Sequence, residues 1–282
     1  MENSKPAPNP PTVRRAAEGE ISVESEVLYQ ERGRDGTVWA EITLNRPGKG
    51  NALTLPMLDE IEGYVRAVGE SRQIRALVLR GEGRFFSAGG DIEAWGNLTP
   101  EEMGSVWIPR GIAVFDAIAK LPQPVVAAIN GDALGGGLEL ALMADLRVAV
   151  AEARLGLPEV GLGMIAGWSG IRRIAETAGV VRARELTLLG APIAAAKALE
   201  WGLVNAVAAD REAMDAQVEA WLDRLLRNAP IAMALTKKLL ASMHAEMSRD
   251  HAEAVAEARA TADCDEGIAA FRAKRRPVFH GR

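Results

Sequence analysis

Two glycine-rich stretches constrain this chain more than any other feature, because each follows an apolar, strand-like run. The first is Ser-Ala-Gly-Gly-Asp at residues 87–91, and the second is Gly-Asp-Ala-Leu-Gly-Gly-Gly at residues 131–137. Glycine lets a backbone N–H turn toward a ligand, since it has no Cβ and tolerates positive φ. Two acidic residues, Glu139 and Glu159, follow soon after the second stretch. This layout predicts main-chain amides that bind one oxygen atom, with carboxylates beside them that move protons.

The hydrophobic pattern predicts an α/β fold. Residues 27–31 and 38–44 are strand-like and flank a loop of hairpin length, and Thr54 is a plausible N-cap for a helix over residues 55–68. A buried strand over residues 74–79, a helix over 112–121, a strand over 125–129 and a helix containing Glu139 continue the alternation. Such alternation predicts a sheet covered by helices, with the site on loops at the carboxyl ends of strands.

The two ends of the chain differ from its middle. Residues 1–20 contain four prolines among small and charged residues and are predicted to form a disordered leader. The β-signal fades from about Ala194, and residues 198–203, 213–227 and 231–262 are predicted helices rich in alanine, leucine and methionine. The predicted division is therefore a leader at 1–20, a core domain at 21–197 and a helical region at 198–282.

Composition excludes several classes of function. The net charge of −5 is spread along the chain, and the only basic block is at residues 274–276, so no nucleic-acid partner is expected. One cysteine and three distant histidines provide neither a disulfide framework nor a zinc cluster. No signal peptide and no run of about 18 apolar residues is present. We expect a cytoplasmic protein that binds neither metal nor membrane.

Other glycine motifs do not fit. The chain contains no G-x-G-x-x-G and no G-K-[ST], and Gly-Trp-Ser-Gly-Ile at residues 167–171 lacks the last glycine of a nucleophile elbow. Dehydrogenase, nucleotidase and serine hydrolase functions are therefore not expected. Both glutamates have structural alternatives: Glu139 as a helix first-turn acid, and Glu159 as part of a capped or salt-bridged turn. Their apolar neighbours instead predict burial, which would raise the pKa of an unpaired carboxylate.

Five segments together resemble the enoyl-CoA hydratase/isomerase (crotonase) superfamily. They are residues 44–47 with 51–52, 86–92, 130–139, 158–162 and 202–204, and the similarity runs from about residue 27 to 279. The resemblance implies a ClpP/crotonase-like α/β fold of repeated β-β-α units with a C-terminal helical trimerisation region. It also implies an acyl-CoA thioester substrate, no metal or redox cofactor, and a homotrimer or a hexamer made as a dimer of trimers.

The resemblance carries catalytic roles onto four residues. The amides of Gly90 and Gly136 would bind the thioester oxygen, and Glu139 and Glu159 would be the two catalytic glutamates. Because many superfamily members keep only one of the two acids, the pair favours hydration of a 2-enoyl-CoA to a 3-hydroxyacyl-CoA. An isomerase that uses Glu159 alone, another acyl-CoA lyase or hydrolase, and a non-catalytic acyl-CoA-binding protein stay open as alternatives.

Substrate contacts are expected at further positions, and three residues at or near the site depart from the family pattern. Gly90 stands where many relatives have alanine, Trp168 where a small residue is usual, and Glu93 where a lysine near the CoA phosphates is common. The tryptophans are expected to shape the acyl pocket, and the alternative is that they are simply core residues. The basic residues are expected to bind the nucleotide part of CoA, and the alternative is that they are solvated surface charges. The predicted contacts are Ala88, Asp91, Ile92, Gly135, Gly167, Trp95, Trp168, Arg46, Lys49 and Lys274.

Overall fold

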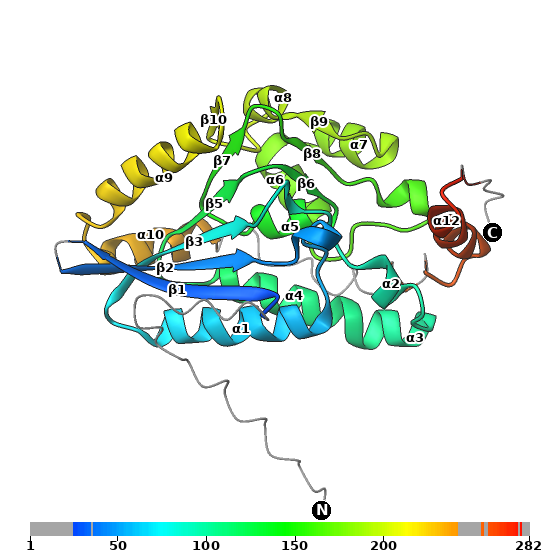
Figure 1. Ribbon diagram of the computed structural model, residues 1–282, viewed down its shortest axis with the longest axis horizontal. Helices are drawn as coiled ribbons and strands as arrows, with labels where there is room; N and C mark the ends of the chain where they lie inside the picture. Colours follow the sequence, from blue (N-terminus) through cyan, green and yellow to red (C-terminus); the bar gives the residue numbers. More distant parts are fainter. Residues whose placement is uncertain (1–24, 35, 242–254, 257–258, 276, 278–282) are drawn as a thin grey trace, which may run out of the picture.

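A six-stranded sheet lies at the centre of the computed structural model (Figure 1), and apolar runs at residues 74–81, 125–129 and 146–150 build its mostly buried inner strands. The structure describes residues 25–34, 36–241, 255–256, 259–275 and 277. The strand order is β1-β2-β3-β5-β7-β10, and only the β1–β2 hairpin is antiparallel. These strands are β1 Val27–Arg34, β2 Thr37–Leu44, β3 Ile74–Gly81, β5 Val125–Ile129, β7 Leu146–Val150 and β10 Ala206–Ala208.

A second, smaller sheet of very short strands carries the glycine loops. Its order is β4-β6-β8-β9, where β4 is Phe85–Ser87, β6 Asp132–Leu134, β8 Arg154–Gly156 and β9 Ile193–Ala194. Strands β4, β6 and β8 run parallel, and β9 is antiparallel to β8. Each of β3, β5 and β7 in the large sheet is followed by β4, β6 or β8 in the small sheet and then by a helical turn. This is the expected repeated β-β-α architecture.

The glycine loops lie at carboxyl ends of strands, as expected, but the nearest strands belong to the small sheet. Strand β4 separates the first stretch from β3, and β6 lies within the second stretch, so Gly90 and Gly136 both follow small-sheet strands. Three residues are too few to show an alternating or continuous apolar pattern, so the small sheet left no signal in the hydrophobic periodicity.

Amphipathic helices cover the large sheet. Helix α1 (Leu55–Glu70) begins at Thr54, whose side chain accepts a hydrogen bond from Met57 N at 3.3 Å, as expected for an N-cap. It packs beside α4 (Ile108–Ala119) below the sheet in Figure 1, while α9 (Arg211–Leu225) packs against β3, β5, β7 and β10. The short helices are η1 Pro47–Lys49, α2 Ile92–Trp95, α3 Pro100–Glu102, the π-helix η2 Met103–Trp107 and η3 Glu159–Leu162.

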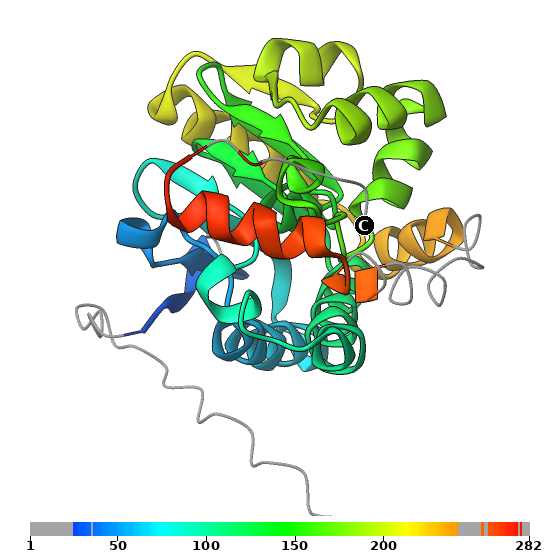
Figure 2. The ribbon, with the colours of Figure 1, turned by 90° about the vertical axis from the view of Figure 1, so that its right-hand side faces the viewer.

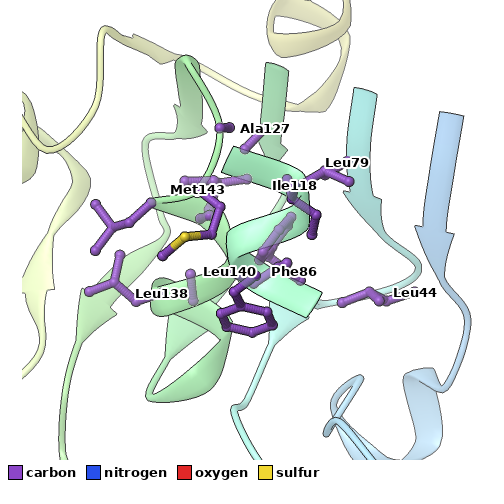
Figure 3. Close-up of a cluster of buried hydrophobic side chains, with 14 of the residues drawn as sticks. Leu44, Leu79, Phe86, Ile118, Ala127, Leu138, Leu140 and Met143 are labelled. Carbon is purple, nitrogen blue, oxygen red and sulfur yellow. The ribbon is translucent and has the colours of Figure 1, made fainter. Parts of the chain in front are cut away.

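Helix α5 (Gly136–Ala141) is buried along its whole length. Figure 3 shows Leu138 and Leu140 of this helix, with Met143 after it, packed among side chains of both sheets and α4. Each such side chain stabilises the fold by about 1.5–3 kcal/mol through the burial of apolar area. The labelled partners are Leu44, Leu79, Phe86, Ile118 and Ala127. This packing fixes the helix that carries Glu139.

The remaining helices are α6 Gly170–Ala178, α7 Val180–Leu189, α8 Ala195–Glu200, α10 Pro230–Ala241 and α12 Ala262–Arg272. Strand β10 lies within the segment predicted to be helical after residue 197 and completes the large sheet. Helix α12 crosses beside α2 in Figure 2, where Arg259 and Arg272 donate hydrogen bonds to Gly96 O and Asn97 Oδ1 at 3.3 Å each. The predicted leader and residues 242–254 lie outside the described residues. Within the described part, every helix is too short or too polar to cross a membrane.

Candidate active site

The two glycine stretches meet because they leave adjacent parallel strands. Ser87 of β4 pairs with Ala133 of β6, so the residues that follow each strand lie at the same edge of the small sheet. A Cβ added to Gly136 would lie 3.3 Å from the backbone nitrogen of Gly90. The structure therefore brings together the two amides that the sequence singled out.

Hydrogen bonds on the preceding carbonyls orient both amides. Leu53 N donates to Gly89 O at 2.7 Å, and Glu139 N donates to Gly135 O at 3.0 Å. Because a trans peptide points its C=O and N–H in opposite directions, the N–H groups of Gly90 and Gly136 face away from these donors. Among the hydrogen bonds between described residues, none uses either N–H. Two fixed donors thus have no acceptor among the residues that the structure describes.

Glu139 lies in the first turn of α5, and it is 1% exposed. Its Oε1 accepts hydrogen bonds from Trp168 N at 2.7 Å and Gly170 N at 2.6 Å, at the start of α6. Ser169 between them adopts φ 77°, a left-handed conformation that lets consecutive N–H groups turn toward one acceptor. A Cβ on Gly170 would lie 2.4 Å from Glu139 Cγ, so the close approach needs glycine there.

Glu159 reaches the same place from β8, the next strand of the small sheet. It begins η3, and its carboxylate lies against the second glycine loop, where a Cβ on Gly135 would be 2.7 Å from Glu159 Oε1. Gly135 also has φ 53°, so both backbone conformation and space require glycine. The other oxygen, Oε2, is buried and has no hydrogen-bond partner among the described residues. A buried carboxylate oxygen without a partner is costly when the group is ionised, and it points to a function.

The surroundings of Glu139 and Glu159 raise the pKa values of the two carboxyl groups by different amounts. Burial raises the pKa of Glu139 to about 7, although the N–H groups of Gly170, Trp168 and Gly167 oppose the rise by stabilising the carboxylate. Burial, with the negative charge of Glu139, raises the pKa of Glu159 to about 8. The N–H groups favour the ionised form of Glu139, whereas the charge of Glu139 favours the protonated form of Glu159, which is the arrangement of a base beside an acid.

A small cavity of about 60 Å³ joins these groups. Gly90, Gly136, Glu139 and Glu159 all line it, together with Gly167 and three tryptophans. The rest of the lining is apolar and consists of Met103, Ile108, Met164, Ile165 and Val255. Two amide donors and an acid–base pair that share one apolar cavity can polarise a carbonyl and move protons at the neighbouring carbons.

Comparisons with known proteins agree with this geometry. The model of the enoyl-CoA hydratase/isomerase family matches residues 34–282. The chain belongs to this family. It is 36% identical to a probable enoyl-CoA hydratase of Bacillus subtilis, over 86% of this chain and 95% of the relative. It is 35% identical to a short-chain-enoyl-CoA hydratase of Clostridium acetobutylicum, over 86% and 94% of the two chains. The crystal structure of an enoyl-CoA hydratase of Bacillus anthracis superposes with a TM-score of 0.73, at 32% identity, over 92% and 100% of the chains.

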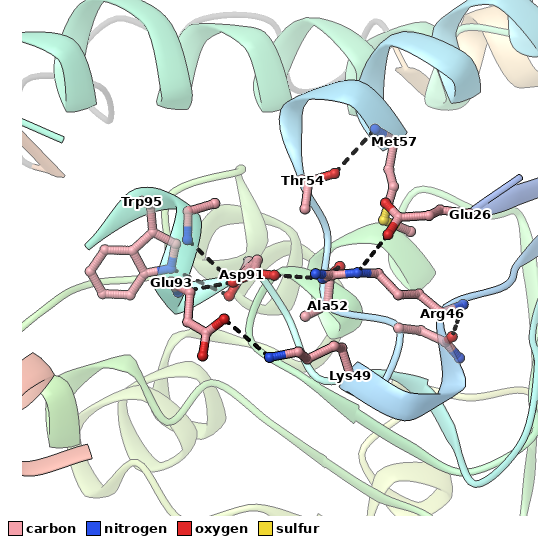
Figure 4. A network of polar contacts seen from close by, with 12 residues as sticks. Glu26, Arg46, Lys49, Ala52, Thr54, Met57, Asp91, Glu93 and Trp95 are labelled. Atoms are coloured by element: carbon pink, nitrogen blue, oxygen red, sulfur yellow. Dashed lines mark hydrogen bonds and ion pairs between the residues drawn. The ribbon is translucent and has the colours of Figure 1, made fainter. Parts of the chain in front are cut away.

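In this family member, Arg46 and Asp91 form one polar network beside the first glycine loop (Figure 4). Asp91 caps α2, and its other oxygen pairs with Arg46, which also donates to Ala52 O at 3.1 Å and pairs with Glu26 at 2.8 Å. Burial would raise the pKa of Asp91, but hydrogen bonds from Arg46 and Ala94 N outweigh it and lower that pKa. With these contacts Arg46 braces the loop that presents Gly90.

The other predicted contacts are spread more widely. Lys49 forms an exposed ion pair with Glu93 at 3.1 Å (Figure 4). Glu93 is the acid at the position where relatives often have lysine, and its charge is balanced by that of Lys49. Lys274 is exposed and follows α12. Ala88, Ile92 and Gly135 belong to the glycine loops but are not among the described residues that line the cavity. For all of these positions, contact with the substrate stays a prediction.

Part of the cavity was not predicted from the sequence. Met103 enters it from the π-helix η2, beside Trp107, one of the tryptophans expected to shape the acyl pocket. The wide turn of η2 is compatible with Pro109, a residue that has no N–H to donate. That proline was a usable signal for an irregular helix. Val255 and Ile165 had no local signal, because only tertiary packing brings them to the cavity.

Proposed function

We propose that this chain is an enoyl-CoA hydratase, which adds water reversibly across the 2,3-double bond of a 2-enoyl-CoA to form a 3-hydroxyacyl-CoA. The observation that carries the proposal is one cavity that contains two amides without acceptors among the described residues and two glutamates with unlike surroundings, Glu139 buried and Glu159 half-buried with a buried Oε2. The names of the related hydratases support the same reaction.

The amides of Gly90 and Gly136 act on the thioester carbonyl. As water adds to C3, negative charge develops on the carbonyl oxygen, and donors that are already oriented stabilise it without reorganisation. Losing one such donor typically costs about 10²–10³ in rate. The amides thus form an oxyanion hole.

The two glutamates divide the proton transfers. Glu139, whose ionised form is stabilised by backbone N–H groups, takes a proton from water as the water oxygen bonds to C3. Glu159, which keeps its proton to higher pH, donates it to C2 as the enolate collapses. One water is added in total, the proton removed equals the proton supplied, and the reverse steps dehydrate the product. The protein groups provide the acid, the base and the oxyanion donors, so this proposal includes no metal or redox cofactor.

The enzyme is also proposed to work as a homotrimer or as a dimer of trimers. The family resemblance suggests this assembly, and α10 supplies a surface for it. Ile231, Leu235, Leu239 and Leu240 on this helix are 55–74% exposed, which is unusual for a surface that only meets water. A cytoplasmic location likewise stays a prediction from the sequence.

Purified protein incubated with crotonyl-CoA tests the proposal. We expect loss of the enoyl-thioester absorbance, a 3-hydroxybutyryl-CoA product by mass spectrometry, and oxygen-18 in that product when the reaction runs in labelled water. Interconversion of 3-enoyl and 2-enoyl substrates without label would instead show an isomerase. Tight binding of CoA esters without turnover of any enoyl-CoA would show a non-catalytic binding protein.

A further inference from the structure

One side of the cavity is a wall of three indole rings. Trp95, Trp107 and Trp168 are only 2–8% exposed, and all three line the space beside Gly90 and Gly136. The rings of Trp107 and Trp168 are 5.5 Å apart, and Phe115 packs edge-on against Trp168 at 5.2 Å. Aromatic groups and the backbone hold Trp168 on several sides. The acyl chain of a substrate therefore cannot displace its ring at low cost in free energy.

Glycines make room for the Trp168 ring. A Cβ on Gly136 would lie 2.4 Å from Trp168 Cζ3, and a Cβ on Gly111 would lie 2.1 Å from Trp168 Nε1. Gly111 is buried within α4, where glycine costs about 0.5–1 kcal/mol relative to alanine. Its φ is not positive, so backbone conformation does not require glycine there. The close approach of the Trp168 indole therefore accounts for glycine at position 111, and Gly111 and Trp168 pack as one unit.

The remaining space is small. The cavity measures about 60 Å³, whereas an apolar cavity of ~150 Å³ is known to accept a benzene molecule. Apart from the two glutamates and the indole N–H groups, the described side chains around it are apolar, and none of them carries a positive charge that could pair with an anionic acyl substituent. The described lining leaves room for a few hydrocarbon groups beyond the thioester, which is less than the space in which an aromatic ring is known to bind.

We propose that Trp168 determines acyl-chain specificity by closing the cavity, so that the enzyme prefers unsubstituted enoyl-CoAs of about four to six carbons and rejects long-chain and aromatic ones. This proposal rests on the proposed hydratase function. Trp95 is a less suitable determinant, because its Nε1 donates to Gly90 O at 3.3 Å and so supports the oxyanion loop. Trp168 donates its hydrogen bond to Glu139 from the backbone N–H, which any replacement except proline keeps.

The test is a chain-length profile of kcat/KM with crotonyl-, hexenoyl-, octenoyl- and decenoyl-CoA. For the wild type we expect a fall of at least ~100-fold between four and ten carbons. Trp168→Ala should raise the decenoyl-to-crotonyl ratio by at least ~10-fold, and Trp168→Phe should fall between the two. Trp201→Phe, which alters a buried tryptophan at the end of α8 and outside the cavity, is the matched control and should keep the wild-type profile.

A coupling measurement keeps the proposal testable if Trp168→Ala is poorly stable. Gly111→Ala should lower Tm in the wild type, where the new methyl meets the indole, and should leave Tm unchanged or raise it in the Trp168→Phe background. An equal change of Tm by Gly111→Ala in both backgrounds would show that the position of the Trp168 ring does not depend on this glycine. That result would count against a rigidly packed Trp168 at the cavity.

Two results separate this inference from the proposed function. If the wild type hydrates decenoyl-CoA as fast as crotonyl-CoA, the Trp168 proposal fails while the hydratase function stands. If no enoyl-CoA is hydrated, the proposed function fails, and calorimetric affinities for butyryl- to decanoyl-CoA then test the wall by binding. Affinity that falls with chain length, and recovers in Trp168→Ala, supports the wall, whereas affinity that is flat or rises in the wild type overturns it.

Discussion

Replacing Glu159 by glutamine is expected to stabilise the folded protein at alkaline pH. The pKa of Glu159 is raised from 4.5 to about 8, first by burial and then by the charge of Glu139. Between these two values the unfolded chain releases the proton while the native state keeps it. The wild type therefore loses stability as pH rises from about 4.5 to 8, and glutamine, which does not titrate, removes this loss.

The size of the effect follows from the shift. At 1.36 kcal/mol per pKa unit, the upper limit at pH values above 8 is about 5 kcal/mol. Because part of the shift belongs to the interaction with Glu139 and local opening admits water, we expect about 2–3 kcal/mol at a pH of about 8.5. At a pH of about 5 the same term is below ~1 kcal/mol. The difference between the two pH values is the readout, since the cost of burying the glutamine amide is common to both.

Urea unfolding at fixed protein concentration measures this difference, with Glu152→Gln, a change at an exposed glutamate, as the matched control. The Glu159→Gln variant should gain stability at the higher pH only, while its hydratase activity falls. An equal gain at both pH values, or a gain that the control shares, would refute the assignment of a raised native pKa to Glu159.

Three further predictions concern the rate, the loop and the assembly. The kcat/KM for crotonyl-CoA hydration should follow a bell between the pKa values of about 7 and 8, because acid protonates Glu139 and base deprotonates Glu159; a flat profile over this range contradicts the pairing. Asp91→Asn should release Arg46 and loosen the Gly90 loop, so kcat should fall about tenfold while KM stays within about twofold; an unchanged kcat would show that the ion pair does not position the amide. Leu235→Asp on α10 should lower the mass measured by analytical ultracentrifugation, and an unchanged mass would show that this helix is not an interface.

Several parts of the fold could be predicted because their signals are local. The N-cap Thr54 and the apolar spacing after it identified α1, and continuous apolar runs identified β3 and β5. The same holds for the paired acids, since an apolar surrounding sequence indicated that Glu139 would be buried. In each case the residues that decide the structure are neighbours in the chain.

The parts that could not be predicted depend on distant residues. Strands β4, β6, β8 and β10 have three residues each, and only pairing with other strands makes them extended. The sequence around Arg46 does not indicate whether its side chain binds a phosphate or pairs with an aspartate 45 residues away. The reason for Gly111 became visible only when the indole of Trp168 was placed against it.

The most direct test of the central claim is the rate of crotonyl-CoA hydration by Glu139→Gln and by Glu159→Gln, measured beside the affinity of each variant for butyryl-CoA. If the two acids share the proton transfers at one thioester, each replacement lowers kcat by about 10²–10⁴-fold while the dissociation constant changes by less than about threefold. A variant that keeps a near-normal kcat would contradict the two-carboxylate mechanism at this site.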